Sequence, residues 1–279
     1  MIDKELLRQA VAKNVTDALQ EDVGSGDLSA AFLPADHRAQ AQIITREDGV
    51  FCGKLWVDET ALQADPQINI EWQVADGDKV TAEQVLFTLT GPARSLLTVE
   101  RTMLNFVQML SATATRTAAY VELIDGTNTV LLDTRKTIPG LRVAQKYAVT
   151  SGGGENHRMG LYDAFLLKEN HIAAAGGIAA AVAMARQAHP DMPVEVETET
   201  LDELNQAIDA GAELAMIDNF SLADSIAAVA LAKGRIKLEA SGGIDEKSIT
   251  EIAATGVDYV SIGELTKKID PLDLSMRFI

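Results

Sequence analysis

Basic side chains are concentrated in one segment of an otherwise acidic chain. The sequence holds 41 Asp and Glu residues against 24 Lys and Arg residues, a formal net charge of −17. Between Asp133 and Ile172 the sign reverses, and the cationic or potentially cationic residues there are Arg135, Lys136, Arg142, Lys146, His157, Arg158, Lys168 and His171. Guanidinium groups pair bidentately with carboxylate or phosphate, and lysines add a point charge. The segment therefore predicts a site for a small polyanion, with a set of structural ion pairs as the alternative.

Carboxylates and glycines stand at the ends of later apolar runs. Glu197 closes VEVE and Asp218 closes LAMID. Hard oxygen ligands of this kind favour Mg²⁺, which commonly also binds substrate phosphates, or they could contact ribose hydroxyls. The alternative is that one of them only caps the following helix. Further along, small residues form turns that resemble phosphate-binding loops, which use backbone N–H groups, although glycine could serve the turn alone. These residues are Ser241, Gly242, Gly243 and Gly263.

A run of three glycines, Gly152 to Gly154, directly precedes Asn156, His157 and Arg158. Glycine permits positive φ and close backbone approach, so a flexible loop and a ligand-binding loop are both compatible with it. The histidines show no metal-binding spacing and no Cys/His cluster occurs, which argues against a zinc site. The single cysteine, Cys52, has no evident base partner in the sequence and is expected to be a small core residue.

The elements that must position these residues are short apolar runs, separated by longer helical stretches, after Gly126. The runs are TVLLDTRK, AFLLKEN, VEVETE, LAMIDNF, KLEASGG and YVSIGE. Because nearly every position in them is apolar, both faces of each strand are expected to be buried, as in a parallel sheet covered by helices. The carboxyl ends of such strands converge on the face that carries the active site. The pattern predicts an incomplete (β/α) barrel built from parallel strands.

The N-terminal part follows a different pattern. Residues 1–20 place apolar side chains at helical spacing between charges of both signs, which is typical of an amphipathic surface helix and not of a secretory signal. Residues 41–91 alternate and break at turn residues, so they predict a small sheet, and residues 93–124 have a helical pattern. The expected organisation is an N-terminal α/β domain over residues 1–112 and an open (β/α) barrel catalytic domain over residues 113–267, with a tail, residues 268–279, that can pack back on the first domain.

Composition excludes several classes of partner. The strongly negative net charge argues against general nucleic-acid binding and against binding to anionic membranes, because both would be repelled. No stretch reaches the roughly 20 apolar residues that a bilayer span requires. A single cysteine cannot form an intramolecular disulfide, so a cytoplasmic location is expected.

The basic segment carries a family likeness. Residues 133–172, DTRKTIPGLRVAQKYAVTSGGGENHRMGLYDAFLLKENHI, closely resemble the signature region of quinolinate phosphoribosyltransferases, also called carboxylating nicotinate-nucleotide pyrophosphorylases. The resemblance extends over essentially the whole chain through LQEDVGSGDLS, ERTMLNFVQMLSATAT, VEVE, IDNF and EASGGI. It implies a pentosyltransferase of de novo NAD biosynthesis, which converts quinolinate and phosphoribosyl pyrophosphate to nicotinate mononucleotide, pyrophosphate and CO₂. It also implies an N-terminal α/β domain, a C-terminal open barrel, and a head-to-tail homodimer with shared active sites.

The resemblance also implies roles for individual residues. Quinolinate would be bound by Arg135, His157, Arg158 and Lys168, with Arg101 supplied by the partner chain. Phosphoribosyl pyrophosphate would be bound by Lys136, Glu197, Asp218, Ser241, Gly242, Gly243 and Gly263, and the catalytic residues would be Lys136, Lys168, Glu197 and Asp218. Glu197 and Asp218 would also hold Mg²⁺, directly or indirectly. Where the family often has a histidine, this chain has Lys267, which could still contact phosphate.

Two other interpretations are open. A related phosphoribosyltransferase acting on a different aromatic acid would keep the barrel and the phosphate loops, but the clustered arginines favour a dicarboxylate. A non-enzymatic carrier or binding module is suggested by ADGDKVTAEQVLFTL, whose rhythm resembles a lipoyl-type half-barrel. That segment lacks a persuasive modified-lysine hairpin, so a small sheet explains it better.

Overall fold

The computed structural model describes residues 2–279, and contacts within the chain divide it into two compact units. The first unit holds the residues up to Ala118 together with Thr137–Gly153 and Leu265–Ile279, and the second holds Ala119–Lys136 and Gly154–Glu264. The expected domain limits, residues 1–112 and 113–267, stay a prediction. Within residues 2–279, no helix combines the length and the apolar character needed to cross a membrane.

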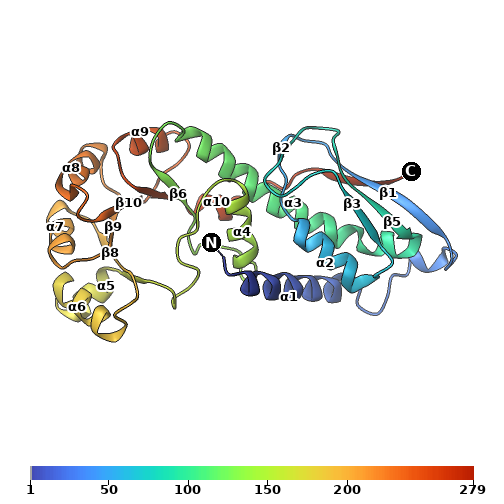
Figure 1. Ribbon diagram of the computed structural model, residues 1–279, viewed down its shortest axis with the longest axis horizontal. Helices are drawn as coiled ribbons and strands as arrows, with labels where there is room; N and C mark the ends of the chain where they lie inside the picture. The colour runs from blue at the N-terminus through green and yellow to red at the C-terminus, as the bar shows by residue number, and fades with distance from the viewer. Residues whose placement is uncertain (1) are drawn as a thin grey trace. The chain divides into compact units, whose positions relative to one another are not determined.

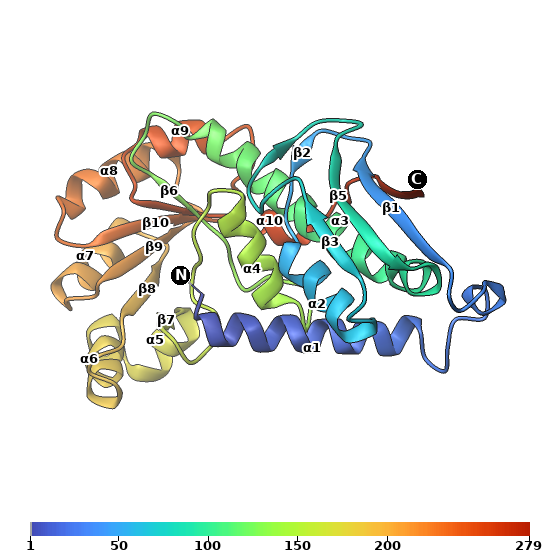
Figure 2. The same cartoon turned by 45° about the vertical axis from the view of Figure 1, so that its right-hand side comes forward.

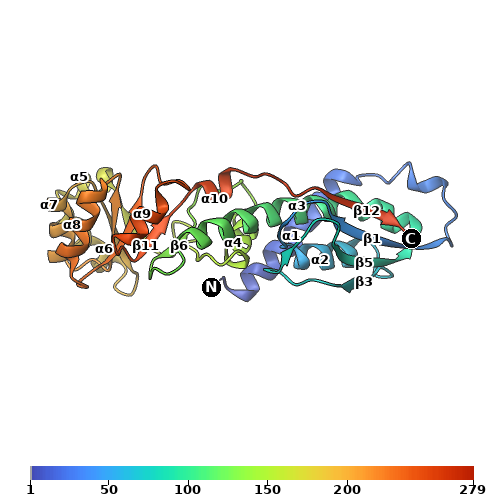
Figure 3. The same cartoon turned by 90° about the horizontal axis from the view of Figure 1, so that it is seen from above.

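A four-stranded antiparallel sheet forms the centre of the first unit. Its order is β12-β1-β5-β3, with β1 at Arg38–Thr45, β3 at Asn69–Trp72, β5 at Val85–Pro92 and β12 at Leu274–Phe278. The C-terminal strand β12 lies beside β1 (Figure 3). The segment with the lipoyl-like rhythm supplies β4 (Lys79–Val80), which pairs with β2 (Gly49–Val50), and the first part of β5. The small sheet predicted from residues 41–91 is therefore present.

Helices α2 (Lys54–Ala64) and α3 (Ala93–Leu123) cover this sheet (Figure 1). Their apolar side chains share one core with Phe87 and Leu89 of β5, both fully buried, because alternate residues of a strand point to the same face. The long helix predicted for residues 93–124 is confirmed. A short 3₁₀ turn, η1 at Ala30–Phe32, precedes β1.

Helix α1 (Lys4–Asp22) is the predicted amphipathic helix. Its first turn is capped by Asp3, whose side chain accepts a hydrogen bond from the backbone N–H of Leu6 at 2.9 Å. Its buried face carries Val11 and Val15, which pack in a second cluster with Trp56 and with α4 (Arg142–Ser151). Cys52 lies in the same cluster as a buried free thiol, which confirms the expectation of a core residue.

The glycine run serves close packing and a turn. A Cβ atom added to Gly152 would lie 2.4 Å from the carbonyl oxygen of Ala114 in α3, and Gly153 has φ of +90°. Only glycine lets the end of α4 approach the backbone of α3 this closely. The run thus has a structural reason that requires neither a flexible loop nor a bound ligand.

The second unit is built on a six-stranded sheet in which every strand pairing is parallel. Its order is β6-β11-β10-β9-β8-β7, with β6 at Val130–Leu132, β7 at Phe165–Leu167, β8 at Val194–Thr198, β9 at Leu214–Asp218, β10 at Lys237–Ser241 and β11 at Tyr259–Ser261. All six predicted strands form, and they do not close into a barrel within residues 2–279. Glu155 bridges to Leu132 in parallel, so the segment after the glycine run lies along the outer edge of β6.

Helices cover the outer face of this sheet. They are α5 (Glu169–Ala175), α6 (Ile178–Ala188), α7 (Leu201–Asp209), α8 (Leu222–Ala232) and α9 (Ile249–Ala254), and the short α10 (Glu264–Lys267) follows β11. Figure 2 shows α6, α7 and α8 along one side of β8, β9 and β10. The alternation of strands with outer helices confirms the predicted α/β class with an incomplete (β/α) barrel.

Candidate active site

Strand register gathers the predicted acidic and glycine residues on the inner face of the parallel sheet. Glu197 on β8 and Glu239 on β10 both lie opposite Met216 of β9, so these three side chains share one layer. Asp218 and Ser241 pair in the next layer, at the carboxyl ends of their strands. Side chains in register on parallel strands point to the same face, so the carboxylates of this site lie on one face of the sheet, in two successive layers of the open barrel.

Lys168 and Glu197, both predicted site residues, are brought together. Lys168 follows β7, and its Nζ donates a hydrogen bond to Glu197 Oε2. The Lys168 side chain is 45% exposed and that of Glu197 is 13% exposed, so the pair lies at the mouth of the barrel. His171 Nδ1 accepts the backbone N–H of Lys168 at 3.0 Å, which fixes the start of α5. The ammonium group is thus held at the strand ends, where it can meet an anion.

The loops that follow β9 and β10 contact each other at the carboxyl ends of these strands. Asn219 donates its backbone N–H to the Ser241 carbonyl at 2.9 Å and its side-chain amide to Asp218 Oδ2 at 2.8 Å. A Cβ atom on Gly242, where φ is +92°, would lie only 2.2 Å from Asn219 Oδ1. Ser261 of β11 donates its hydroxyl to Ser241 Oγ at 3.2 Å. Only glycine fits at position 242, which explains this residue of the predicted phosphate loop.

Gly263 and Lys136 lie against each other. A Cβ atom on Gly263 would lie 2.7 Å from Lys136 Cδ and 3.4 Å from Thr134 Oγ1. The contact follows from the pairing of β6 with β11, since both residues come just after the ends of these strands. An exposed lysine therefore passes over a glycine of the second predicted phosphate loop.

Two arginines form the cationic part of the site. Arg158 is partly buried, and its Nη1 donates a hydrogen bond to the Ala164 carbonyl at 3.1 Å. Burial and then the nearby charge of Arg135 lower the pKa of Arg158. Two guanidinium groups whose charges repel are favourably placed to bind one anion between them, because the anion relieves their repulsion.

His157 sits in an acidic cluster that was not predicted. Its Nε2 lies 3.0 Å from Glu195 Oε2 and 3.2 Å from Glu239 Oε2, and these side chains are 11%, 5% and 0% exposed in that order. Burial lowers the pKa of His157, but hydrogen bonds and charges from the two glutamates outweigh it and raise the pKa to about 10. Burial raises the pKa of Glu195 to about 7, against the hydrogen bond from His157. His157 therefore keeps its proton at neutral pH.

On the other side of the ring, His157 Nδ1 lies 2.7 Å from the backbone nitrogen of Arg158. Nothing in the sequence pairs His157 with Glu195 and Glu239, although a glutamate inside a strand that is apolar on both faces signals an unusual buried position.

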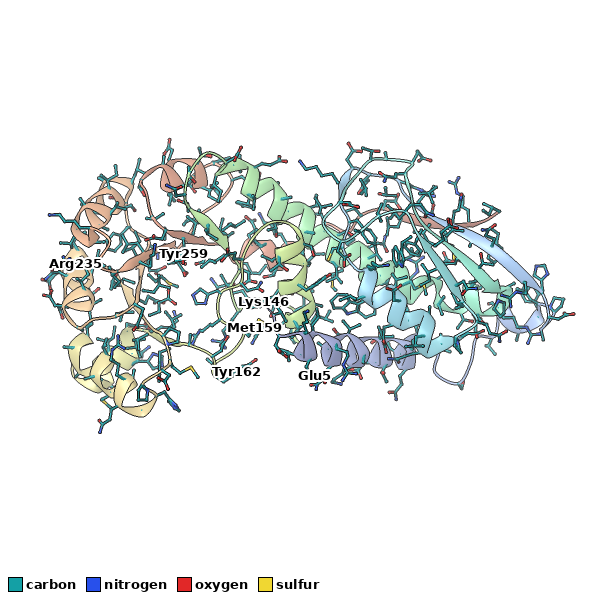
Figure 4. The ribbon with its side chains drawn as sticks, viewed as in Figure 1. Glu5, Lys146, Met159, Tyr162, Arg235 and Tyr259 are labelled. Atoms are coloured by element: carbon teal, nitrogen blue, oxygen red, sulfur yellow. The ribbon has the colours of Figure 1, made fainter. Side chains whose placement is uncertain are left out.

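Asp133 holds the same segment from the end of β6. It is completely buried, and its two oxygens accept the backbone N–H of His157 at 3.0 Å and the side-chain amide of Asn156 at 2.7 Å. After Arg158 the chain continues through an exposed loop in which Met159 and Tyr162 are labelled in Figure 4. The segment that carries Arg158 is thus held by side chains of the sheet and not by regular secondary structure.

A cavity of 380 Å³ opens beside His157 and Arg158. Its other walls include Leu214, Lys237 and Tyr259, which are the first residues of β9, β10 and β11. These are the amino ends of the strands, whereas the glycine turns lie at the carboxyl ends. The arrangement of the glycine turns therefore favours the carboxyl ends as the place of the chemistry.

Two predicted residues belong to the first unit. Arg101 is exposed on α3, and Lys267 is exposed at the end of α10. Their roles toward quinolinate and phosphate stay predictions.

Family models and curated relatives match this chain over most of its length. The model of the quinolinate phosphoribosyl transferase N-terminal domain matches residues 27–111, and that of the C-terminal domain matches residues 113–277. A probable carboxylating nicotinate-nucleotide pyrophosphorylase of Bacillus subtilis (strain 168) is 43% identical over 258 residues, which cover 92% of this chain and 89% of that protein. A carboxylating nicotinate-nucleotide pyrophosphorylase of Mycobacterium leprae (strain TN) is 39% identical over 277 residues, 96% of each chain.

A solved structure of the same kind of enzyme has a similar fold. The nicotinate-nucleotide pyrophosphorylase from Francisella tularensis superposes with a TM-score of 0.95 at 51% identity, covering 98% of this chain and 97% of that one. The chain therefore belongs to the quinolinate phosphoribosyl transferase family.

Proposed function

We propose that this chain transfers a phosphoribosyl group from phosphoribosyl pyrophosphate to quinolinate, with loss of CO₂, and so makes nicotinate mononucleotide for NAD biosynthesis. Two features carry most of the argument. The charge of Arg135 acts on the partly buried Arg158, and Gly242 closely approaches Asn219 in the loops that follow β10 and β9 of the open barrel. A dicarboxylate and a phosphate each have a matching site, and the relatives named above are carboxylating pyrophosphorylases.

Quinolinate would be held as a dianion by Arg135, Arg158 and Lys168. The guanidinium groups suit bidentate pairing with carboxylates, and the ammonium of Lys168 is held at the barrel mouth by Glu197. We further propose that the protein is a homodimer in which Arg101 of a second copy completes this site. An exposed arginine on α3 is available for that role.

Phosphoribosyl pyrophosphate would bind along the strand ends. Its 5-phosphate would lie on the backbone of the turns at Ser241, Gly242, Gly243 and Gly263, with Lys267 as a further cation. Lys136 would meet the pyrophosphate, which agrees with its contact with Gly263. Glu197 and Asp218 would contact the ribose hydroxyls.

Magnesium is the expected cation, and the donor set fits it. Glu197 and Asp218 present hard carboxylate oxygens at the ends of neighbouring strands, and no soft ligand belongs to the proposed set. When bound, Mg²⁺ would neutralise charge on the leaving pyrophosphate. Lys136 would share in this by its own charge.

The proposed reaction depends mainly on how the protein positions its two substrates. The pyridine nitrogen forms a bond to ribose C1 as the bond from C1 to the pyrophosphate oxygen breaks, through a cation-like ribosyl centre. The electron pair of the bond to the adjacent carboxylate then remains on the ring carbon beside the positive nitrogen as CO₂ leaves, and that carbon takes up a proton. Fixed charges at Arg135, Arg158 and Lys136 serve by holding two polyanions together.

The test is a reaction of the purified protein with quinolinate, phosphoribosyl pyrophosphate and Mg²⁺, with nicotinate as the parallel substrate. Equal amounts of nicotinate mononucleotide and CO₂ from quinolinate alone are expected. Turnover of nicotinate or another acid, with none of quinolinate, would contradict the assignment of the arginines. Omission of Mg²⁺ tests the cation, and sedimentation tests the dimer. A cytoplasmic location is part of the proposal, and it is supported by a single, buried cysteine.

A further inference from the structure

The side-chain amide of Gln145 joins two segments that are far apart in the sequence. Gln145 lies on α4 and is completely buried. Its Oε1 accepts the backbone N–H of Ile138 at 2.7 Å, and its Nε2 donates a hydrogen bond to the carbonyl of Thr266 at 2.9 Å. Because one partner is a donor and the other is an acceptor, only one orientation of the amide satisfies both. The amide therefore links the segment after β6 to helix α10 in a defined geometry.

Each of the two segments carries a lysine of the proposed phosphate site. Lys136 precedes Ile138 by two residues. Lys267 directly follows Thr266. The segments also approach each other at a second point, because a Cβ atom on Gly263, the residue before α10, would lie 2.7 Å from Lys136 Cδ. A shift of either segment would therefore change the place of a lysine.

Neither segment has regular structure that could set its position alone. Residues 136–141 contain neither helix nor strand, and α10 is a short helix of four residues, Glu264–Lys267. A helix of this length is not stable by itself, so its place depends on tertiary contacts. Lysine side chains are flexible, and the place of each ammonium group therefore depends on the backbone that carries it. A fixed link between the two backbones is what an arrangement of this kind requires.

We infer that Gln145 is a positioning residue for phosphoribosyl pyrophosphate. It sets the separation of the two segments so that Lys136 meets the pyrophosphate and Lys267 meets the 5-phosphate. The inference rests on the proposed function, which assigns these phosphate groups to the two lysines. It gives a role in binding to a buried residue of α4 that belongs to neither proposed ligand set.

Two substitutions separate the hydrogen bonds from the volume that the side chain fills. Gln145→Met keeps a long unbranched side chain of similar size and loses both hydrogen bonds. Gln145→Glu keeps an oxygen that accepts the N–H of Ile138, whereas a carboxylate has no hydrogen to donate to the Thr266 carbonyl. Gln108→Met is the matched control, because Gln108 Nε2 in the same unit donates to the Leu272 carbonyl at 2.7 Å, outside both lysine-bearing segments.

Calorimetric titration with inorganic pyrophosphate and with ribose 5-phosphate, each in the presence of Mg²⁺, examines the two lysines separately. Gln145→Met should weaken the binding of both ligands roughly tenfold, the change expected when a buried hydrogen bond is lost. Gln145→Glu should keep its affinity for pyrophosphate and lose affinity for ribose 5-phosphate. Gln108→Met should change neither. Wild-type affinity for both ligands in Gln145→Met, or a loss for pyrophosphate as large in Gln145→Glu as in Gln145→Met, would overturn the inference.

Steady-state kinetics and a double substitution exclude a purely structural role. Gln145→Met should raise the KM for phosphoribosyl pyrophosphate and leave the KM for quinolinate unchanged, whereas a general disturbance of the fold would raise both. In a Lys136→Met background, Gln145→Met should cause little further loss of pyrophosphate affinity, because the ammonium group that it positions is absent. Fully additive losses would contradict positioning through Lys136.

Amide hydrogen exchange at Ile138 keeps the test independent of turnover. The N–H of Ile138 should be protected in the wild type and in Gln145→Glu, and should exchange much faster in Gln145→Met. Rapid exchange in the wild type would overturn the inference. If quinolinate is not turned over, but protection of Ile138 and affinity for pyrophosphate are lost together in Gln145→Met, the proposed function fails and the positioning of Lys136 by Gln145 stands.

Discussion

Replacement of Arg158 by alanine should weaken quinolinate binding far more than it weakens the fold. Its guanidinium is partly buried beside Arg135, and it makes one hydrogen bond to a backbone carbonyl, that of Ala164, at 3.1 Å. Loss of one partner of a desolvated charge pair costs about 2–5 kcal/mol. Because Arg158 is only partly buried, about 3 kcal/mol is a reasonable value, which corresponds to a rise of roughly 150-fold in the KM for quinolinate.

The fold should lose little from the same change. A hydrogen bond to a backbone carbonyl contributes about 1 kcal/mol, and removal of one guanidinium relieves part of the repulsion with Arg135. Arg235→Ala is a matched control in the same unit, since the Nη2 of Arg235 donates to the Leu231 carbonyl at 3.1 Å (Figure 4). Arg235 is exposed and lies outside the proposed site, so its loss should leave both Michaelis constants unchanged.

The assay is the initial rate at saturating phosphoribosyl pyrophosphate, with calorimetric titration of quinolinate and urea unfolding of each variant. Arg158→Lys should be intermediate, because it keeps the charge and loses the planar fork. An unchanged KM for quinolinate in Arg158→Ala would refute the reasoning. So would an equal rise in the constants for both substrates, which would indicate a general disturbance of the barrel.

Three further outcomes are expected. The pKa of His157 is raised from 6.5 to about 10, so the native state holds more protons than the unfolded state between these pH values. The free energy of unfolding, measured by urea titration, should therefore fall as the pH rises through this window. His157→Gln should make this fall smaller. Gly242→Ala should raise the KM for phosphoribosyl pyrophosphate far more than Gly243→Ala does. The Cβ added at position 242 lies 2.2 Å from a side-chain oxygen, whereas the Cβ added at position 243 meets no atom of residues 2–279 within 4 Å. Similar effects of the two changes would contradict the steric argument. Arg101→Ala and Lys168→Ala proteins, each inactive alone, should regain activity when their chains are exchanged, and failure despite exchange shown by mass spectrometry would exclude a shared site.

The parallel sheet was predictable because burial of a strand on both faces gives a simple sequence pattern. Strands covered by helices outside and by side chains inside are apolar at nearly every position, so their limits and the polar residues that follow them can be read directly. Asp218 and Lys168 were found in this way, as residues at strand ends. No strand end marks Arg101 or Lys267, because both lie on helices, α3 and α10.

The glycine run shows why a local pattern can have several causes. Sequence alone cannot distinguish a mobile loop, a ligand-binding loop and a close packing contact, because each favours glycine. The choice depends on Ala114, whose carbonyl oxygen would be 2.4 Å from a Cβ atom at position 152. That oxygen belongs to a helix far away in the chain, so no inspection of the run itself could reveal it.

The two glutamates of VEVE show the same limit within one strand. Glu195 and Glu197 have the same neighbours in sequence and point to the same face of β8, yet they lie in different layers of the barrel. Glu197 meets Lys168 at the mouth, where a charged side chain can reach a substrate. Glu195 is nearly inaccessible and shares His157 with Glu239, a residue of another strand, so desolvation raises its pKa to about 7. Depth in the barrel, which is set by the position along β8, therefore decides which of these two carboxyl groups meets Lys168 and which is buried beside His157.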